Sequence, residues 1–170
     1  LESVVREHGD LPGEQKKTLE HFRSELEAGQ ISLFIDSVKV KDGYELALEN
    51  YLGDKLHSIL IHDEKTFEKV LSYHEENQIR GNYFCTYHLE APKSTIKAKK
   101  DYIPFTDLVT ASDKRINHFL ANLFGGVFYV ESLKDSANSV LNNKDGKAHV
   151  SADGLILDTS GAFESKAQLE

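Results

Sequence analysis

Two stretches of the chain carry the same pattern of hydrophobic residues, at the spacing of a helix with one apolar face. Each stretch has apolar residues at positions i, i+3, i+4, i+7 and i+8 and ends in a glycine, a common helix stop. The offset between them is constant, because 116 − 44 and 125 − 53 both give 72. This constancy predicts a structural repeat. The paired residues are Tyr44, Ala47, Leu48, Tyr51, Leu52 and Gly53, then Ile116, Phe119, Leu120, Leu123, Phe124 and Gly125.

The segments around both helices repeat as well. A short run of β-forming residues precedes each helix, and an apolar strand, a second amphipathic helix and more strand material follow it. We therefore predict an α/β (α+β) fold of two related small mixed α/β lobes in tandem, at 29–92 and 93–165. The expected strands are 32–36, 58–61 and 82–87 in the first lobe and 102–107, 127–130, 148–150 and 155–157 in the second; the second helices carry Phe67, Val70, Leu71 and His74, then Leu133, Ala137, Val140 and Leu141.

The first 28 residues contain no β-type run and carry apolar residues at helical spacing. A break at 10–13 separates two helical pieces, and the second has a narrow stripe of Leu19, Phe22 and Leu26. Such a stripe either packs on the lobes or continues into a partner helix. Because the chain lacks methionine and ends in Leu169-Glu170, which cloning often leaves, we expect an excised piece of a longer protein.

Charge and composition narrow the possible partners. The 170 residues include 20 Lys+Arg and 28 Asp+Glu, a net charge of −8, so the chain as a whole repels nucleic acid and anionic membranes. No apolar run is long enough to span a bilayer. A single cysteine cannot form an internal disulfide, which favours the cytoplasm. One basic patch stands out, as a weak, non-specific DNA-binding site or a solvated loop: Lys93, Lys97, Lys99 and Lys100.

The sequence carries little that predicts catalysis. Nucleotide-binding glycine motifs and HExxH are absent, and Cys85 with His88 forms only half of a zinc site, so we expect no metal and no cofactor. Asp36, Asp63 and Glu131 lie at or just past strand ends, where a Mg²⁺-dependent hydrolase is conceivable. However, a helix N-cap explains Asp63 completely. We expect no catalytic residue; a ligand-binding or regulatory module on the duplicated lobe is the other alternative.

The order of residues resembles a known family. Residues 38–56, which include Tyr44-Glu45-Leu46-Ala47-Leu48-Glu49 and Leu52-Gly53, are followed by an apolar strand that ends at Asp63. Together they resemble the hinge domain of structural maintenance of chromosomes (SMC) proteins. The repeat at 116–125 is similar to the second lobe of that family, and 151–157 resembles its Leu-Asp-Gly-x-Leu hairpin. The resemblance covers about 30–165.

The resemblance implies a function. An SMC hinge joins two halves of a long antiparallel coiled coil and dimerises, so that two distant ATPase heads form a ring for chromosome condensation, cohesion or segregation. Residues 1–28 would be the coiled-coil end of the incoming arm and 166–170 the start of the outgoing arm or a tag remnant. The partner would be the same chain or a paralogous SMC hinge, with no small-molecule substrate, in the cytoplasm on chromosomes or in a eukaryotic nucleus.

The open edges of the predicted sheets suggest where a dimer interface lies. Each predicted lobe has too few strands to close on itself, so its edge backbone groups need a partner across a two-fold axis. The resemblance places one edge at 159–165, where Gly161 would permit close backbone approach and Phe163 could bury its ring. We expect 82–86 to be the facing edge. The expected interface residues are Asn82, Tyr83, Phe84, Cys85, Thr86, Thr159, Ser160, Gly161, Ala162 and Phe163.

Overall fold

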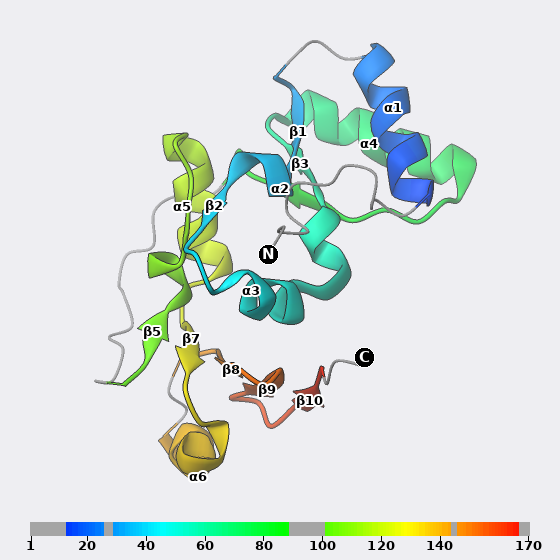
Figure 1. Cartoon of the computed structure of the whole chain (residues 1–170). Helices are drawn as coiled ribbons and strands as arrows, with labels where there is room; N and C mark the ends of the chain where they lie inside the picture. The colour runs from blue at the N-terminus through cyan, green and yellow to red at the C-terminus, as the bar shows by residue number, and fades with distance from the viewer. Residues whose placement is uncertain (1–12, 26–28, 89–100, 144–145, 167–170) are drawn as a thin grey trace. The chain divides into compact units, whose positions relative to one another are not determined.

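The structure is a computed structural model that describes residues 13–25, 29–88, 101–143 and 146–166. Its contacts divide the chain into two compact units: Leu1–Val38 with Gly53–Leu89, and Lys39–Leu52 with Glu90–Glu170. Figure 1 shows the helices and strands of both. The division departs from the expected lobes at one segment, since 39–52 packs with the second unit. There, Lys39 and Val40 pair with a second-unit strand, and the Tyr44 ring contacts Tyr129 edge-on at 5.0 Å.

A three-stranded sheet organises the first unit. Its order is β1-β3-β4, with β1 antiparallel to β3 and β3 parallel to β4. A parallel neighbour requires a crossover connection, which α4 provides. The elements are α1 (Gly13–Glu25), β1 (Ile31–Leu33), α2 (Phe34–Ser37), the 3₁₀ helix η3 (Gly53–His57), β3 (Ile59–Ile61), α4 (Glu64–Asn77) and β4 (Tyr83–Cys85).

The central strand of this sheet is buried on both faces. Ile59, Leu60 and Ile61 are consecutive and all fully buried. Ile61 packs in a cluster with Phe22 of α1 and Val70 of α4. Burial of successive side chains, which point to opposite faces of a strand, means that β3 forms the core of the first unit.

The helix α1 packs on the first unit, which decides between the two alternatives for residues 13–25. Leu19 and Phe22 of the predicted stripe are buried. The buried Gln15 ties the helix to the sheet: its Nε2 donates to the carbonyl oxygens of His57 (2.8 Å) and Asn82 (2.9 Å), and its Oε1 accepts from the backbone N–H of Asn82 (3.2 Å). The first helical piece and Leu26 lie outside the described residues.

A five-stranded sheet organises the second unit. Its order is β10-β9-β8-β7-β5, with β7 and β8 parallel and the other neighbours antiparallel. The elements are β2 (Lys39–Val40), α3 (Glu45–Leu52), β5 (Ile103–Pro104), the 3₁₀ helix η4 (Phe105–Asp107), β6 (Val109–Thr110), α5 (Lys114–Leu123), β7 (Val127–Val130), α6 (Leu133–Asn143), β8 (Ala148–Ser151), β9 (Leu155–Asp158) and β10 (Phe163–Ser165).

The two copies of the predicted repeat have the same plan. Each runs strand, short helix, two-residue strand, helix, strand, helix, strand, and in each the last two strands are parallel and flank a crossover helix. The equivalent strands β2 and β6 pair antiparallel with each other. The hairpin β9–β10 follows the second copy. The expected mixed α/β fold with a repeat is therefore confirmed.

Two predicted strands turn into short helices. The runs 32–36 and 102–107 begin as strands, but the chain turns into α2 at Phe34 and into η4 at Phe105. Phe34 and Ile35 are both buried, so the backbone curls to place neighbouring side chains in the core. In the second run Pro104, at φ −63°, precedes the 3₁₀ helix. Tertiary packing here overrides local β propensity.

We expect Gln15→Leu to lower the free energy of unfolding by about 1–3 kcal/mol, because the substitution removes three part-buried hydrogen bonds to the backbone of His57 and Asn82. Urea denaturation followed by circular dichroism measures the change. Glu20→Ala on the exposed side of the same helix is the control. Equal stability of the two variants would mean that Gln15 does not anchor α1.

Candidate functional site at two open sheet edges

The three-stranded and the five-stranded sheet each end in a strand that contains residues expected at the interface. Within the part of the chain described, β4 pairs with β3 alone and β10 pairs with β9 alone. Of the expected residues, Tyr83, Phe84 and Cys85 form β4, with Asn82 and Thr86 flanking it, and Phe163 begins β10. Thr159, Ser160 and Gly161 lie instead in the turn before β10, and Ala162 connects that turn to the strand.

The hydrogen bonds of β4 reveal which of its backbone groups face the open edge. Asn82 O accepts from Ile59 N (3.0 Å), and Thr86 N donates to Ile61 O (3.0 Å). Alternate residues of a strand direct their N–H and C=O to opposite sides. Tyr83 and Cys85 therefore direct their backbone groups away from β3.

The same argument applies to β10. Asp158 N donates to Ala162 O (2.8 Å), and Lys166 N donates to Gly154 O (2.7 Å). Residues between these two contacts alternate in direction. Phe163 and Ser165 therefore direct their N–H and C=O away from β9. Ser165 lies within the edge expected at 159–165 but was not among the expected interface residues.

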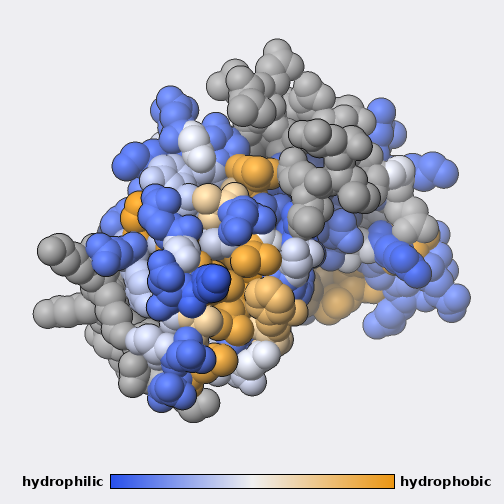
Figure 2. Space-filling view, turned by 60° about the horizontal axis from the view of Figure 1, so that its bottom comes forward, coloured by the Kyte–Doolittle hydropathy of each residue, from blue (hydrophilic) through white to orange (hydrophobic). Residues whose placement is uncertain are grey.

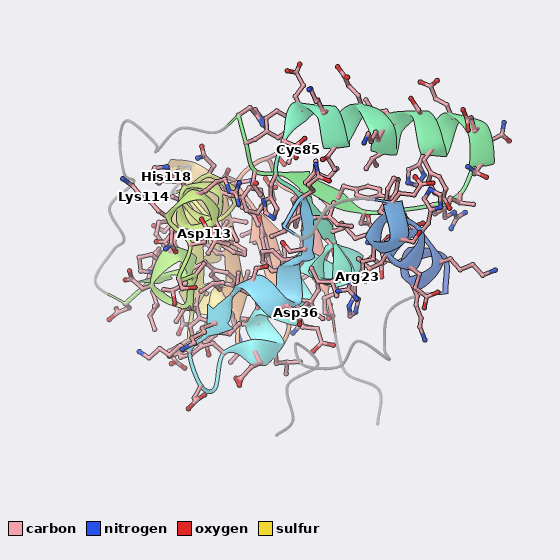
Figure 3. The ribbon with its side chains drawn as sticks, turned by 90° about the horizontal axis from the view of Figure 1, so that it is seen from above. Arg23, Asp36, Cys85, Asp113, Lys114 and His118 are labelled. Carbon is pink, nitrogen blue, oxygen red and sulfur yellow. The ribbon has the colours of Figure 1, made fainter. Side chains whose placement is uncertain are left out.

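The side chains of Tyr83 and Cys85 fix the position of β4. Both pack in the cluster formed by α1, α4 and Ile61, and Figure 3 shows Cys85 on the strand beside α4. The Tyr83 hydroxyl lies 2.5 Å from His74 Nε2 on α4. Burial raises the pKa of the Tyr83 hydroxyl well above its usual range and also raises the pKa of the Cys85 thiol. Both groups are therefore neutral at pH 7.

Phe163 is a large hydrophobic residue with little cover in the isolated chain. Its side chain is 58% exposed. It lies opposite Leu157, which packs with Val130, Leu133 and Val140, so Phe163 is on the face of the sheet that α6 covers. An exposed phenylalanine at an open strand edge is a candidate contact for a partner. In Figure 2, which does not mark Phe163, hydrophobic residues gather on one part of the face in view and hydrophilic residues cover most of the rest.

The turn before β10 depends on Gly161 for a reason that the sequence analysis did not give. Gly161 has φ +105°, where other residues are strained, and an added Cβ would meet no atom within 4 Å. Its N–H donates to Asp158 O (2.9 Å), and Asp158 Oδ1 accepts from Ser160 N (2.7 Å). Close approach of a partner stays a prediction, and Gly161→Asp would strain the turn whether or not a partner binds.

A polar chain beneath β4 was missed by sequence reasoning. His62 Nδ1 lies 2.8 Å from Thr86 Oγ1, and His62 Nε2 lies 2.8 Å from Ser32 Oγ on β1. Thr86 Oγ1 also donates to Ile61 O (3.3 Å). These contacts connect the segments beyond β3 and β4 to β1. No local motif marks them, because the three residues meet only through the sheet.

The carboxylates that suggested a hydrolase form no metal-binding group within the described residues. Asp36 and Asp63 belong to the first unit and Glu131 to the second. Asp63 is the N-cap of α4: it accepts from Thr66 N at 2.8 Å, and this hydrogen bond lowers the pKa of its carboxyl group. Among the described ranges no group of three His, Cys, Asp or Glu could hold a metal ion, and no helix there is long and apolar enough to cross a membrane. Lys93, Lys97, Lys99 and Lys100 lie outside the described residues.

Comparison with protein families decides the identity of the fold. The flexible hinge domain of SMC proteins matches residues 27–140, more than half of the chain. This chain belongs to the SMC hinge family. Comparison with curated proteins gives no match.

Solved SMC hinges share the fold of this hinge domain. The Geobacillus stearothermophilus SMC hinge, solved as an asymmetric dimer, is 21% identical with a TM-score of 0.76, covering 96% of this chain and 69% of that one. The Pyrococcus furiosus Smc hinge with an extended coiled coil is 22% identical with a TM-score of 0.71; 91% of this chain spans 57% of that longer chain. The S. pombe Smc5/6 hinge is 10% identical with a TM-score of 0.65, covering 93% and 66%.

We expect acid to loosen the turn that positions β10. The Ser160 N–H holds the pKa of the Asp158 carboxyl below its usual value, so this hydrogen bond stabilises the hinge above the unfolded pKa and is lost as pH falls through the folded pKa. Amide-exchange protection at Gly161 should fall over that acidic range. In Asp158→Ala this protection should be low at every pH. In Asp153→Ala, which alters the neighbouring turn, its pH dependence should be that of the wild type. A pH-independent wild type would contradict this.

Proposed function

We propose that this hinge domain dimerises through its two open edges, β4 of one molecule pairing with β10 of another. The observation that carries the proposal is that backbone N–H and C=O groups point away from the sheet at both edges, at Tyr83 and Cys85 and at Phe163 and Ser165, and that no strand of the described ranges pairs with them. Burying an edge strand against a partner strand satisfies those groups and covers the Phe163 ring. The hinge itself carries out no catalysis and takes no cofactor.

Two-fold symmetry makes the contact reciprocal, so the dimer contains two β4–β10 pairs. Such a dimer would join the coiled-coil arms of two SMC ATPases, to which 1–28 and 166–170 lead, and close a ring that organises chromosomes. Within 13–25, α1 packs on the first unit, so the incoming arm would be held by the sheet that presents β4. The parent protein would supply the ATPase heads, in the cytoplasm on chromosomes or in a nucleus.

The partner is either a second copy of this chain or a paralogous SMC hinge. The Geobacillus hinge forms an asymmetric dimer, and the S. pombe hinge is that of Smc5/6. These relatives support self-association or pairing with a paralogue for this chain. Weak, salt-sensitive DNA binding through Lys93, Lys97, Lys99 and Lys100 belongs to the same proposal, and the net charge of −8 opposes it.

We expect Ser165→Pro to convert the dimer to a monomer. Proline removes the one N–H of this residue, which points away from β9, so the hydrogen bonds of the β9–β10 hairpin remain. Size-exclusion chromatography with light scattering measures the mass, and circular dichroism checks the fold.

Ser165→Ala is the matched control, because it shortens the same side chain but retains the backbone N–H. It should dimerise like the wild type. A folded Ser165→Pro variant that remains fully dimeric would show that β10 is not the interface. A wild type that is monomeric alone would require a paralogous hinge, and mixing with candidate hinges tests that outcome.

A further inference from the structure

The side chain of Gln15 continues the ladder between β3 and β4 by one step. Hydrogen bonds of a parallel pair are evenly spaced and involve every second residue of each strand. Ile59 N donates to Asn82 O (3.0 Å), so the preceding bond of the ladder would run from Asn82 N to His57 O. Instead, Gln15 Oε1 accepts from Asn82 N (3.2 Å) and Gln15 Nε2 donates to His57 O (2.8 Å). A carboxamide from α1 thus takes the place of a bond between the two strands.

The position of His57 explains why a side chain is needed at this step. His57 is the last residue of η3, so the chain enters β3 from a 3₁₀ helix and not from an extended strand. Gln15 Nε2 also donates to Asn82 O (2.9 Å), which uses the second hydrogen of the amide. Because the Gln15 side chain is buried, α1 must be docked on the sheet for these bonds to form.

Two further contacts tie α1 to β4 and to its crossover helix. Thr18 follows Gln15 by three residues on the same face of α1; it is fully buried and hydrogen-bonds the Tyr83 hydroxyl. Phe22 packs in the cluster that includes Tyr83, and its ring contacts that of Tyr73 on α4 edge-on at 5.0 Å. One face of α1 therefore contacts both the start of β4 and the helix that leads into it.

We infer that α1 is a coupling element: its docking holds the start of the open edge strand β4 in place, and its withdrawal releases that start. The inference rests on the proposed function, in which 1–28 is the end of the incoming arm and β4 pairs with a partner. It adds a connection that dimerisation alone does not require, because the state of the arm sets the order of the edge.

Two states of the first unit follow from these contacts. In the docked state Asn82 is hydrogen-bonded through its N–H to Gln15 and through its C=O to Gln15 and Ile59. In the released state the bonds to Gln15 are lost, and β4 keeps its three-residue pairing with β3. A short edge strand of this kind opens readily. A partner strand that pairs with β4 favours the ordered strand, so by linkage it also favours docking of α1 by the same factor.

Amide hydrogen exchange measured by NMR tests the inference within one molecule. Glu20 is exposed on α1, and Glu20→Pro breaks the helix near its centre without removing a buried side chain. The Asn82 amide should then exchange about tenfold faster, as expected for the loss of one part-buried hydrogen bond. The Thr86 amide, which donates to Ile61 O at the other end of the ladder, should change far less.

Glu20→Ala is the matched control, because it removes the same side chain and keeps the helix. Its Asn82 amide should exchange at the wild-type rate. Gln15→Leu, which removes only the carboxamide, should also accelerate exchange at Asn82 relative to Thr86, and it decides the question if circular dichroism finds Glu20→Pro unfolded. Wild-type exchange at Asn82 in a folded Glu20→Pro or Gln15→Leu variant overturns the inference.

The proposed dimer supplies the reciprocal test. Analytical ultracentrifugation should give Glu20→Pro a dimer dissociation constant about tenfold higher than that of Glu20→Ala, because coupling acts equally in both directions. Equal dissociation constants would overturn the coupling. If the wild type is a monomer both alone and with paralogous hinges, the proposed function fails, whereas the exchange rate at Asn82 in that monomer still decides whether α1 holds β4.

Discussion

The open edge of a small sheet is the constraint on which this hinge domain depends. A strand at an edge leaves half of its N–H and C=O groups without a strand partner, and three or five strands cannot close into a barrel that would remove the edges. The edge strands of this domain differ in whether they can pair with another strand. Pro104 lies in β5, where it lacks a donor and makes that edge a poor template. The strands β4 and β10 contain no proline, so they remain competent to pair.

The repeat explains how much of the fold could be predicted. The spacing of apolar residues at i, i+3 and i+4 indicates which face of a helix is buried, and the same spacing occurs at Tyr44–Leu52 and at Ile116–Phe124. What local pattern does not record is which sheet a helix packs on. The helix at 45–52 lies between first-unit elements in the sequence yet packs with the second unit, because β2 pairs with β6 and Tyr44 contacts Tyr129. Contacts of that kind depend on long-range pairing, which periodicity does not encode.

The sequence predicted approximately where the two open edges lie, but not which residues of each edge strand face outward. The aromatic run at 82–86 predicted the first edge, and the family resemblance placed the second at 159–165; the structure has β4 at Tyr83–Cys85 and β10 at Phe163–Ser165. Only the end of the expected edge at 159–165 is a strand: Thr159 to Gly161 form a turn held by Asp158, and β10 begins at Phe163. Which residues face outward follows from the alternation of hydrogen bonds, and a shift of one residue would reverse every assignment. Sequence pattern alone does not fix that parity.

Comparison of equivalent positions in the two copies of the repeat distinguishes residues of the core from residues at the surface. Val70 and Val140 are buried at the same position of α4 and α6, as a shared core demands. Leu71 and Leu141 are equivalent too, but both are exposed, at 47% and 39%. One such leucine would be ordinary surface. Two at equivalent positions, each on the crossover helix that flanks an open edge, are apolar side chains that the proposed dimer would help to cover.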